Sequence, residues 1–314
     1  METINENLTT VAQKHEFKFE EYLVFYFDIL GQKELLKNLK VDDHGNNGDV
    51  NKIFSCIVEF NARMNRLLKK AKKLSLNLIE GSTIFATEDD KRKVLNSIEQ
   101  MEVGLQQFSD LTMIYVKIGT PAVWFISFII LLEISTLMTF QMANGFIVRG
   151  PVVRGMGCKL ENNCLYGPVL YEANEIETQI AQWGRMVFSL EAYKFFKEIT
   201  IIARRCGIKE DSDIVYGIEN LIKKDIDGAL YLDYLAPEMM RFFKKQGLGS
   251  DNVLEAQKAG LKYIVEQKKK FGDTDDALSK GRKLALRYKI MEYYWISRMN
   301  EWSDEEKVRK ILGE

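Results

Sequence analysis

The chain has 314 residues and is close to electrical neutrality, with 44 lysines and arginines against 45 aspartates and glutamates. This balance disfavours a nucleic-acid-binding protein, which would carry an excess of positive charge. The length allows one large hydrophobic core or two modest ones. The four cysteines lack metal-ligand spacing and no signal-peptide pattern opens the chain, so we expect a cytoplasmic protein with reduced thiols.

An aspartate interrupts the first apolar segment of the chain. Residues 22–31 are rich in aromatic and aliphatic side chains, stop at Gly31 and are too few for a core helix, so they predict a strand with Asp28 near its C-terminal end. An ionised carboxylate buried in a central strand is costly unless a cation neutralises it. Two interpretations stay open: Asp28 binds a metal ion, or it caps a helix over residues 32–40.

The next segments are mostly helical in pattern. Residues 32–75 predict two helices around a polar loop at residues 41–49, with the clearest apolar spacing in residues 53–68. Residues 76–87 predict a strand, and residues 89–101 predict a helix.

A second aspartate lies at the tip of a predicted hairpin. Residues 103–117 contain two β-like runs separated by Phe-Ser-Asp-Leu, which places Asp110 in the turn. An aspartate in such a turn is often only a turn former. If the strands that carry Asp28 and Asp110 are neighbours, the two carboxylates can share divalent cations, and Mg²⁺ suits such a site.

One segment is almost apolar enough to span a membrane. It covers residues 122–141. A span here would put the Asp110 hairpin and the later strands on opposite sides of a membrane. We therefore expect a helix buried between the sheet and a dimer partner, with Glu133 and the serines and threonines on its less buried side.

Two Arg-Gly pairs follow, Arg149-Gly150 and Arg154-Gly155, in a predicted strand. Next come a Gly-Pro-Val-Leu segment that opens a helical pattern over residues 168–177, and a short strand that begins at Arg185. Beyond residue 189 the pattern predicts helices over residues 190–205, 253–271 and 277–302, with one strand at residues 228–235.

The order of these blocks carries a resemblance. The Phe-Asp-Ile-Leu-Gly strand, the Phe-Ser-Asp hairpin, the Arg-Gly strand, the Gly-Pro-x-Leu segment and the last Arg-hydrophobic strand resemble the catalytic domain of class III nucleotide cyclases. They are most similar to the bacterial pyrimidine cyclases of the Pycsar antiphage defence system. The resemblance covers about residues 20–190.

The resemblance implies an α/β (α+β) fold, with a mixed, mostly antiparallel sheet flanked by helices. The catalytic domain would cover residues 1–190, and residues 191–314 would form a mainly helical extension on the same unit. The implied activity is conversion of UTP or CTP to the 3′,5′-cyclic monophosphate and pyrophosphate, as a second-messenger signal in antiphage defence. A purine cyclase that uses ATP or GTP and a non-catalytic nucleotide-binding relative remain alternatives. A diguanylate-cyclase-like enzyme lacks support, because the hairpin has no Gly-Gly-Asp/Glu-Glu-Phe motif.

The resemblance also assigns roles to individual residues. It implies two Mg²⁺ or Mn²⁺ ions at Asp28, Ile29 and Asp110, with phosphate oxygens held by backbone N–H groups of Ile29, Leu30 and Gly31. The candidate catalytic residues are Arg149, Arg154 and Tyr171, and Arg185 is a further candidate for the transition-state cation. Which arginine stabilises the transition state stays open.

Base recognition and assembly follow from the same comparison. Gln106 and Cys164 stand where relatives that recognise adenine have a lysine and an aspartate, which argues against ATP. Glu175 stands where related enzymes have an arginine, and this departure prompts the non-catalytic alternative. The resemblance implies a homodimer in which Asp28 and Asp110 of one subunit face the helix of residues 171–177 of the other.

Overall fold

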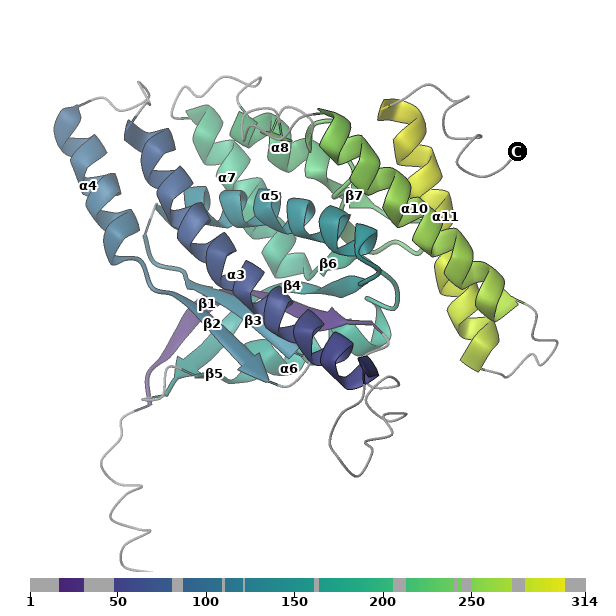
Figure 1. Ribbon diagram of the computed structural model, residues 1–314. Coiled ribbons are helices and arrows are strands. Elements are labelled where there is room, and N and C mark those ends of the chain that lie inside the picture. The colour runs from purple at the N-terminus through teal and green to yellow at the C-terminus, as the bar shows by residue number, and fades with distance from the viewer. Residues whose placement is uncertain are drawn as a thin grey trace, which may run out of the picture.

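The computed structural model describes residues 17–30, 48–80, 87–108, 111–120, 122–160, 164–205, 213–239, 242–243, 250–272 and 280–302. Within this part of the chain, an eight-stranded sheet lies between helices (Figure 1). The fold is mixed α/β with a mostly antiparallel sheet, which confirms the predicted fold class at this level.

The strand β1 (Phe19–Ile29) lies inside the sheet, whose order is β2-β3-β1-β4-β6-β8-β7 with β5 paired to β4. The remaining strands are β2 (Val103–Phe108), β3 (Leu111–Lys117), β4 (Val148–Lys159), β5 (Leu165–Tyr166), β6 (Met186–Phe188), β7 (Ile222–Lys224) and β8 (Leu230–Leu232). Among the strand pairs of the described residues, only β4–β6 is parallel. The order β2-β3-β1-β4 is that of a split βαβ arrangement. Strand β3 lies between β1 and β2, which α3 and α4 connect, and β1 lies between β3 and β4, which α5 connects.

Helices cover both faces of this sheet. They are α3 (Gly48–Glu80), α4 (Glu88–Gln100), α5 (Ala122–Ala143), α6 (Pro168–Gln179), α7 (Leu190–Arg205), α8 (Asp213–Leu221), α10 (Ser250–Gly272) and α11 (Lys280–Trp302). In Figure 1, α6 lies below the sheet, whereas α3 and α5 lie above it.

Side chains of β1 alternate between two cores, as expected for a strand with both faces covered. Leu23, Phe25 and Phe27 belong to the larger core, to which α5 contributes. Tyr22, Val24 and Tyr26 belong to a smaller core between the sheet and α6. Asp28 continues the second series, so the alternation directs its side chain to the α6 face.

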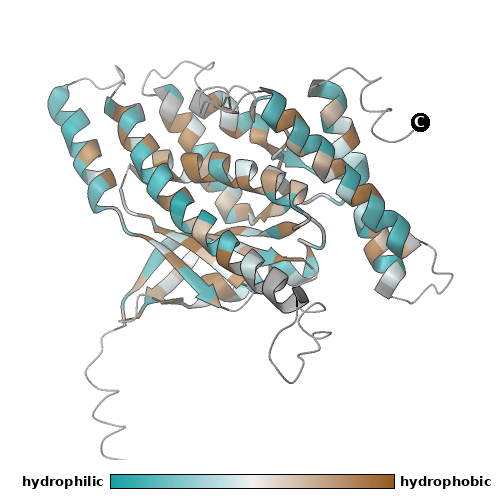
Figure 2. Ribbon diagram, viewed as in Figure 1, coloured by the Kyte–Doolittle hydropathy of each residue, from teal (hydrophilic) through white to brown (hydrophobic). Residues whose placement is uncertain are grey.

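Helix α5 is the centre of the larger core. Of the described helices, only α5 is long and apolar enough to cross a membrane, and most of it is buried among other elements. In Figure 2 the visible side of α5 is mostly hydrophobic, while α3 and α10 carry many hydrophilic residues. These are the properties of a helix in a hydrophobic core.

Two details of the predicted environment of α5 were wrong. Its cover comes from α3 and α10 of the same chain and not from a dimer partner. Glu133 and Ser135 are buried rather than on a less buried side. Glu133 is neutralised by Lys70 of α3, with Nζ 2.9 Å from Oε1, and the Ser135 hydroxyl donates to the Leu131 carbonyl. Local partners therefore allow polar groups inside the core.

The prediction of a strand over residues 76–87 was also wrong for its first part. Residues 76–80 continue α3, and residues 81–86 lie outside the described part of the chain. Ala71, Ser75 and Ile79 are fully buried at a spacing of four, which is the helical period. The candidate helix at residues 32–40 also lies outside the described residues.

The C-terminal region joins the same sheet. The predicted strand near residue 230 is confirmed as β8, which pairs with β6 and β7. Helices α10 and α11 form an antiparallel pair, and α10 packs on α5.

A buried carboxylate anchors α11 to the end of β8. Asp233 is fully buried and accepts from the Tyr294 hydroxyl at 2.8 Å. Arg298 binds both of its oxygens, with Nε 3.1 Å from Oδ1 and Nη2 2.8 Å from Oδ2. The Tyr294 oxygen also accepts from the Leu235 amide. One polar network therefore fixes the position of the helix.

Burial raises the pKa of Asp233 from 3.8 to about 6, although the charge of Arg298 opposes this shift. Between these values the folded protein binds the proton more tightly than the unfolded chain, so this residue's contribution to stability falls as pH rises through 6. Relative to Asp233→Asn, the unfolding free energy of the wild type should increase by about 2–3 kcal/mol when pH falls from 7.5 to 4. Urea denaturation of both proteins checks this, and a pH-independent difference would contradict it.

Candidate functional site

Asp28 is paired with an arginine from the neighbouring strand. The register places Asp28 opposite Arg149 of β4. Both Nε and Nη2 of Arg149 donate to Asp28 Oδ2, at 2.9 and 2.7 Å. The two side chains are 17% and 14% exposed, so the pair lies at the edge of the protein interior. Arg149 thus supplies the cation that the position of Asp28 requires.

The glycine after Arg149 explains this close fit. Gly150 has φ 153°, and a Cβ at this position would lie 1.9 Å from the backbone oxygen of Tyr26. Only glycine lets β4 approach β1 so closely here. The Arg-Gly pair therefore combines a charged side chain with the close strand contact that places it beside Asp28.

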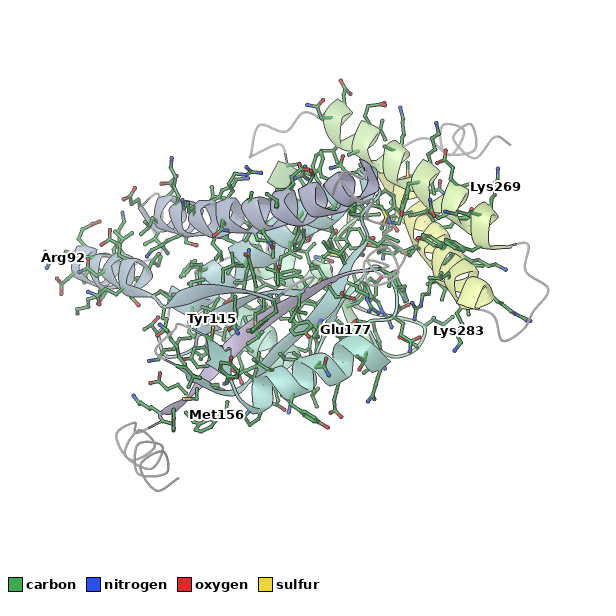
Figure 3. All side chains as sticks on the ribbon, turned by 60° about the horizontal axis from the view of Figure 1, so that its bottom comes forward. Arg92, Tyr115, Met156, Glu177, Lys269 and Lys283 are labelled. Carbon is green, nitrogen blue, oxygen red and sulfur yellow. The ribbon has the colours of Figure 1, made fainter. Side chains whose placement is uncertain are left out.

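A second carboxylate reaches the same guanidinium from α6. Glu177 forms an ion pair with Arg149 Nη2, and its side chain is 10% exposed. Figure 3 shows Glu177 between α6 and the sheet. Arg149 Nη1 donates to the carbonyl of Ala181 at 3.0 Å, in the turn after α6. Two carboxylates and a backbone carbonyl thus surround one guanidinium.

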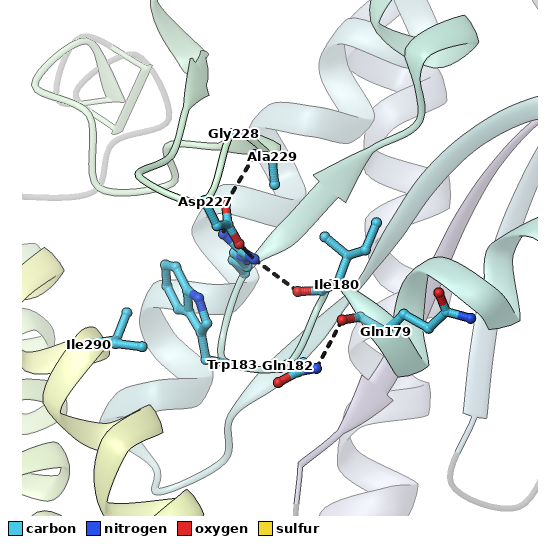
Figure 4. Close-up of a pocket in the computed structure, with 9 residues that line it drawn as sticks. Gln179, Ile180, Gln182, Trp183, Asp227, Gly228, Ala229 and Ile290 are labelled. Carbon is cyan, nitrogen blue, oxygen red and sulfur yellow. Dashed lines mark hydrogen bonds and ion pairs between the residues drawn. The ribbon is translucent and has the colours of Figure 1, made fainter.

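The turn after α6 also forms the wall of a pocket. This open pocket of about 580 Å³ lies between the end of α6, the β7–β8 turn and α11 (Figure 4). Its lining includes the Gln179 and Gln182 amides, the Trp183 ring and Ile290 of α11. Because Ala181 adjoins the pocket-lining residue Ile180, the pocket lies next to the Asp28–Arg149 pair.

Arg185 lines the pocket and is held mainly by two aspartates of the β7–β8 turn. Its guanidinium forms ion pairs with Asp225 and Asp227, donates to the Ile180 carbonyl at 2.8 Å, and lies 4.8 Å from the centroid of the Trp183 ring. Hydrogen bonding to Arg185 lowers the pKa of Asp227. With 2% of its side chain exposed, Arg185 has a structural position.

Arg154 is not brought to the Asp28 site. It lies five positions after Arg149 in β4, and because side chains alternate along a strand, the two point to opposite faces of the sheet. Arg154 Nε is 2.8 Å from Glu21 Oε1, and its guanidinium lies 5.5 Å from the ring centroid of Phe195 in α7. Its contacts are those of a structural ion pair.

Tyr171 lies on the outer side of α6. It is 67% exposed, and its hydroxyl donates to Glu175 Oε1 at 2.9 Å. Neither residue contacts the Asp28–Arg149 pair. The part of this helix that does reach the pair is Glu177 of the same chain, whereas the resemblance implied a helix from a second subunit.

Gln106 and Cys164 are brought close together on the α6 face. Gln106 is 5% exposed, and its Oε1 accepts from the amide of Leu165, the residue after Cys164, at 2.7 Å. Its Nε2 is buried without a hydrogen-bond partner among the described residues. Gln106 stands opposite Met113, which in turn stands opposite Tyr26, so it is two strands from β1.

The remaining predicted residues lie at the end of β1. Ile29 is buried in the larger core, and the Leu30 amide donates to the Ile147 carbonyl at 2.9 Å, so this N–H group is already used. Gly31 and Asp110 lie outside the described residues. Leu111, which follows Asp110 in the chain, stands directly opposite Asp28.

The described residues supply part of a binding site for a divalent cation. Both hydrogen bonds from Arg149 go to Asp28 Oδ2, which leaves Oδ1 without a hydrogen-bond partner among the described residues. No group of three or more His, Cys, Asp or Glu side chains with metal-binding geometry occurs in the described ranges, which exclude Asp110. Asp28 Oδ1 is therefore the atom that would bind a metal ion, together with Asp110.

Two charged residues at or near this site were not predicted from the sequence: Glu177, and Arg287, whose electrostatic neighbours include Arg149 and Glu177. Glu177 was noted only as the end of a helix, although its position four residues after Ala173, which is buried beneath the sheet, would have directed it to the same face. Arg287 lies in α11, where nothing in the sequence relates it to Asp28.

Comparison of the chain with protein-family models, with curated proteins and with solved structures finds no match. A functional proposal therefore rests on the geometry of the site and on the resemblance of its motifs.

Proposed function

We propose that this protein is a metal-dependent nucleotide cyclase of the class III type that converts UTP or CTP to the 3′,5′-cyclic monophosphate and pyrophosphate. One observation carries the proposal. Three sequence blocks that resemble the cyclase motifs, separated by up to 121 residues, meet at one end of the sheet. Asp28 stands opposite both Leu111, the residue after Asp110, and Arg149.

In this proposal, Mg²⁺ or Mn²⁺ held by Asp28 and Asp110 would activate the ribose 3′-hydroxyl and neutralise charge on the departing pyrophosphate. Arg149 holds the Asp28 carboxylate through Oδ2 and makes no hydrogen bond to Oδ1. Charged groups held in place in this way would contribute to catalysis by positioning the metal ion and by electrostatic stabilisation. Arg149 is the only one of the three candidate arginines that contacts Asp28, so we assign it to the active site, and we assign structural roles to Arg154 and Arg185.

Assembly and biology belong to the same proposal. A homodimer in the cytoplasm that makes a cyclic nucleotide signal during phage infection agrees with the resemblance. The outer side of α6, with the exposed Tyr171 and Glu175, is the part of this helix that a second subunit would contact.

A second candidate function is binding of a nucleotide without catalysis. The observation that favours it is the Asp28–Arg149 pair itself, because a carboxylate that already has a cation needs no metal. Both candidates use the same surface and differ in whether product forms.

A substrate screen separates these possibilities. We expect the purified protein, incubated with each NTP and Mg²⁺ or Mn²⁺, to cyclise UTP or CTP about tenfold to hundredfold faster than ATP or GTP. The physical reason is that Gln106 and Cys164 replace the paired polar groups that hold adenine in relatives. Product identity by mass spectrometry, with EDTA as the control, measures this. Faster cyclisation of ATP or GTP would overturn the pyrimidine assignment alone, whereas nucleotide binding without product would favour the second candidate.

A further inference from the structure

Arg287 differs from the arginines that the structure places in ion pairs. Its side chain is half-buried in α11, yet it makes no hydrogen bond or ion pair with any other residue in the part of the chain that is described. Arg149, Arg154, Arg185 and Arg298 each bind at least one carboxylate. A half-buried guanidinium that has no hydrogen-bonded or ion-paired carboxylate among the described residues keeps its donors open to a negatively charged ligand.

The surroundings of Arg287 connect it to the Asp28 site. Burial and the positive charge of Arg149 lower its pKa, while the negative charge of Glu177 raises it, so both residues are electrostatic neighbours. Ile290, three residues further along α11, lines the pocket beside the 180–185 turn. Residues three apart lie on the same face of a helix. Arg287 therefore faces the region between this pocket and the Arg149–Glu177 pair.

The chemistry of this region suits a polyphosphate. Arg149 uses its N–H groups on Asp28, Glu177 and the Ala181 carbonyl, whereas no described residue accepts a hydrogen bond from the guanidinium of Arg287. A planar guanidinium binds phosphate oxygens in a bidentate manner. An anion between the two arginines would also remove the repulsion between their like charges.

We propose that Arg287 binds the polyphosphate group of the nucleotide on which the Asp28–Arg149 site acts. The inference rests on the proposed function for the identity of the nucleotide. It makes α11 part of substrate binding, which no motif in the C-terminal region of the sequence indicated.

Inorganic tripolyphosphate is a suitable probe, because its binding needs no turnover. Calorimetry with the full chain in Mg²⁺ would compare the wild type with Arg287→Gln, Arg287→Lys and the control Lys289→Gln. Lys289 is exposed on the same helix, so the control removes one positive charge of α11 away from the site. We expect Arg287→Gln to weaken binding about tenfold to hundredfold, Arg287→Lys to restore part of the affinity, and Lys289→Gln to change it less than about twofold.

Stability and kinetics complete the test. Because Arg287 has no partner among the described residues, Arg287→Gln should leave the melting temperature unchanged, whereas a purely structural role would lower it. In cyclisation assays the variant should raise KM with a smaller change in kcat. Equal tripolyphosphate affinity in the wild type and Arg287→Gln, or no binding by the wild type, would overturn the inference.

The two proposals fail in distinguishable ways. Arg287-dependent binding of tripolyphosphate without any cyclic product would refute the cyclase and support the anion site. Cyclic product whose KM is unaffected by Arg287→Gln would support the cyclase and refute the role of Arg287.

Discussion

Asp28→Asn is expected to reduce cyclisation by at least about 10²–10³-fold, because it removes the charge that would hold the metal ion while keeping the size of the side chain. The amide still presents an oxygen to Arg149, so the strand pairing should persist. Initial rates at saturating UTP or CTP over a range of Mn²⁺ concentrations measure the effect.

Glu21→Gln is the matched control for this variant. Glu21 is a carboxylate on the same strand, paired with Arg154 on the opposite face of the sheet. Its replacement should leave the rate within about twofold, since exposed ion pairs contribute little and the residue is remote from Asp28. Full activity of Asp28→Asn would contradict the metal site and leave Asp28 as a partner of Arg149 only.

A double-mutant cycle between Asp28→Asn and Arg149→Gln separates the two roles of Asp28. A coupling energy of about 0.5–3 kcal/mol in unfolding would be the contribution of the ion pair, which exists without metal. If Asp28→Asn abolishes activity while the protein stays folded, the loss of activity is due to the missing metal ligand and not to the missing ion pair.

Arg298→Ala should have the largest effect on stability, about 3–5 kcal/mol, because it leaves the buried Asp233 carboxylate without its cation. Part of this cost would be relieved by protonation, since burial already raises the pKa of Asp233 to about 6. Urea or thermal denaturation measures the loss.

Glu301→Ala is the control for Arg298. Glu301 is an exposed partner of the same guanidinium, 2.6 Å from Nη1, and its removal should cost less than about 1 kcal/mol. If Arg298→Ala were no more destabilising than Glu301→Ala, the polar network would not be what holds α11 in place.

The sequence was sufficient for the strands that surround Asp28. The first apolar run, the two β-like runs of residues 103–117 and the amphipathic helices of the C-terminal region all have local patterns. They are confirmed by β1, by the antiparallel pair β2 and β3, and by α7, α10 and α11. The need for a cation at Asp28 also followed from the sequence, because it depends only on the charge of the Asp28 carboxylate and on its position in a buried strand.

The identity of that cation could not be predicted. Arg149 lies 121 residues from Asp28, and only the register of β1 against β4 decides that the two side chains meet. Arg149 and Arg154 have the same Arg-Gly context, although their spacing of five already indicates opposite faces of one strand.

The end of α3 was predicted wrongly for a physical reason. Leu74, Leu76 and Leu78 alternate with Ser75 and Asn77, which is typical of a strand. In the folded chain the helix continues, because Ser75 and Ile79 lie one turn apart on its buried side. Tertiary packing therefore overrides the local pattern.

The burial of most of α5 has a consequence for biosynthesis. Its cover is provided by α3, which precedes it, and by α10, which begins about a hundred residues after α5 ends. At typical synthesis rates of about 5–20 residues per second, α10 follows α5 by roughly 5–20 s. During this interval the nascent chain would expose a long hydrophobic helix, a preferred target for chaperones that act at the ribosome.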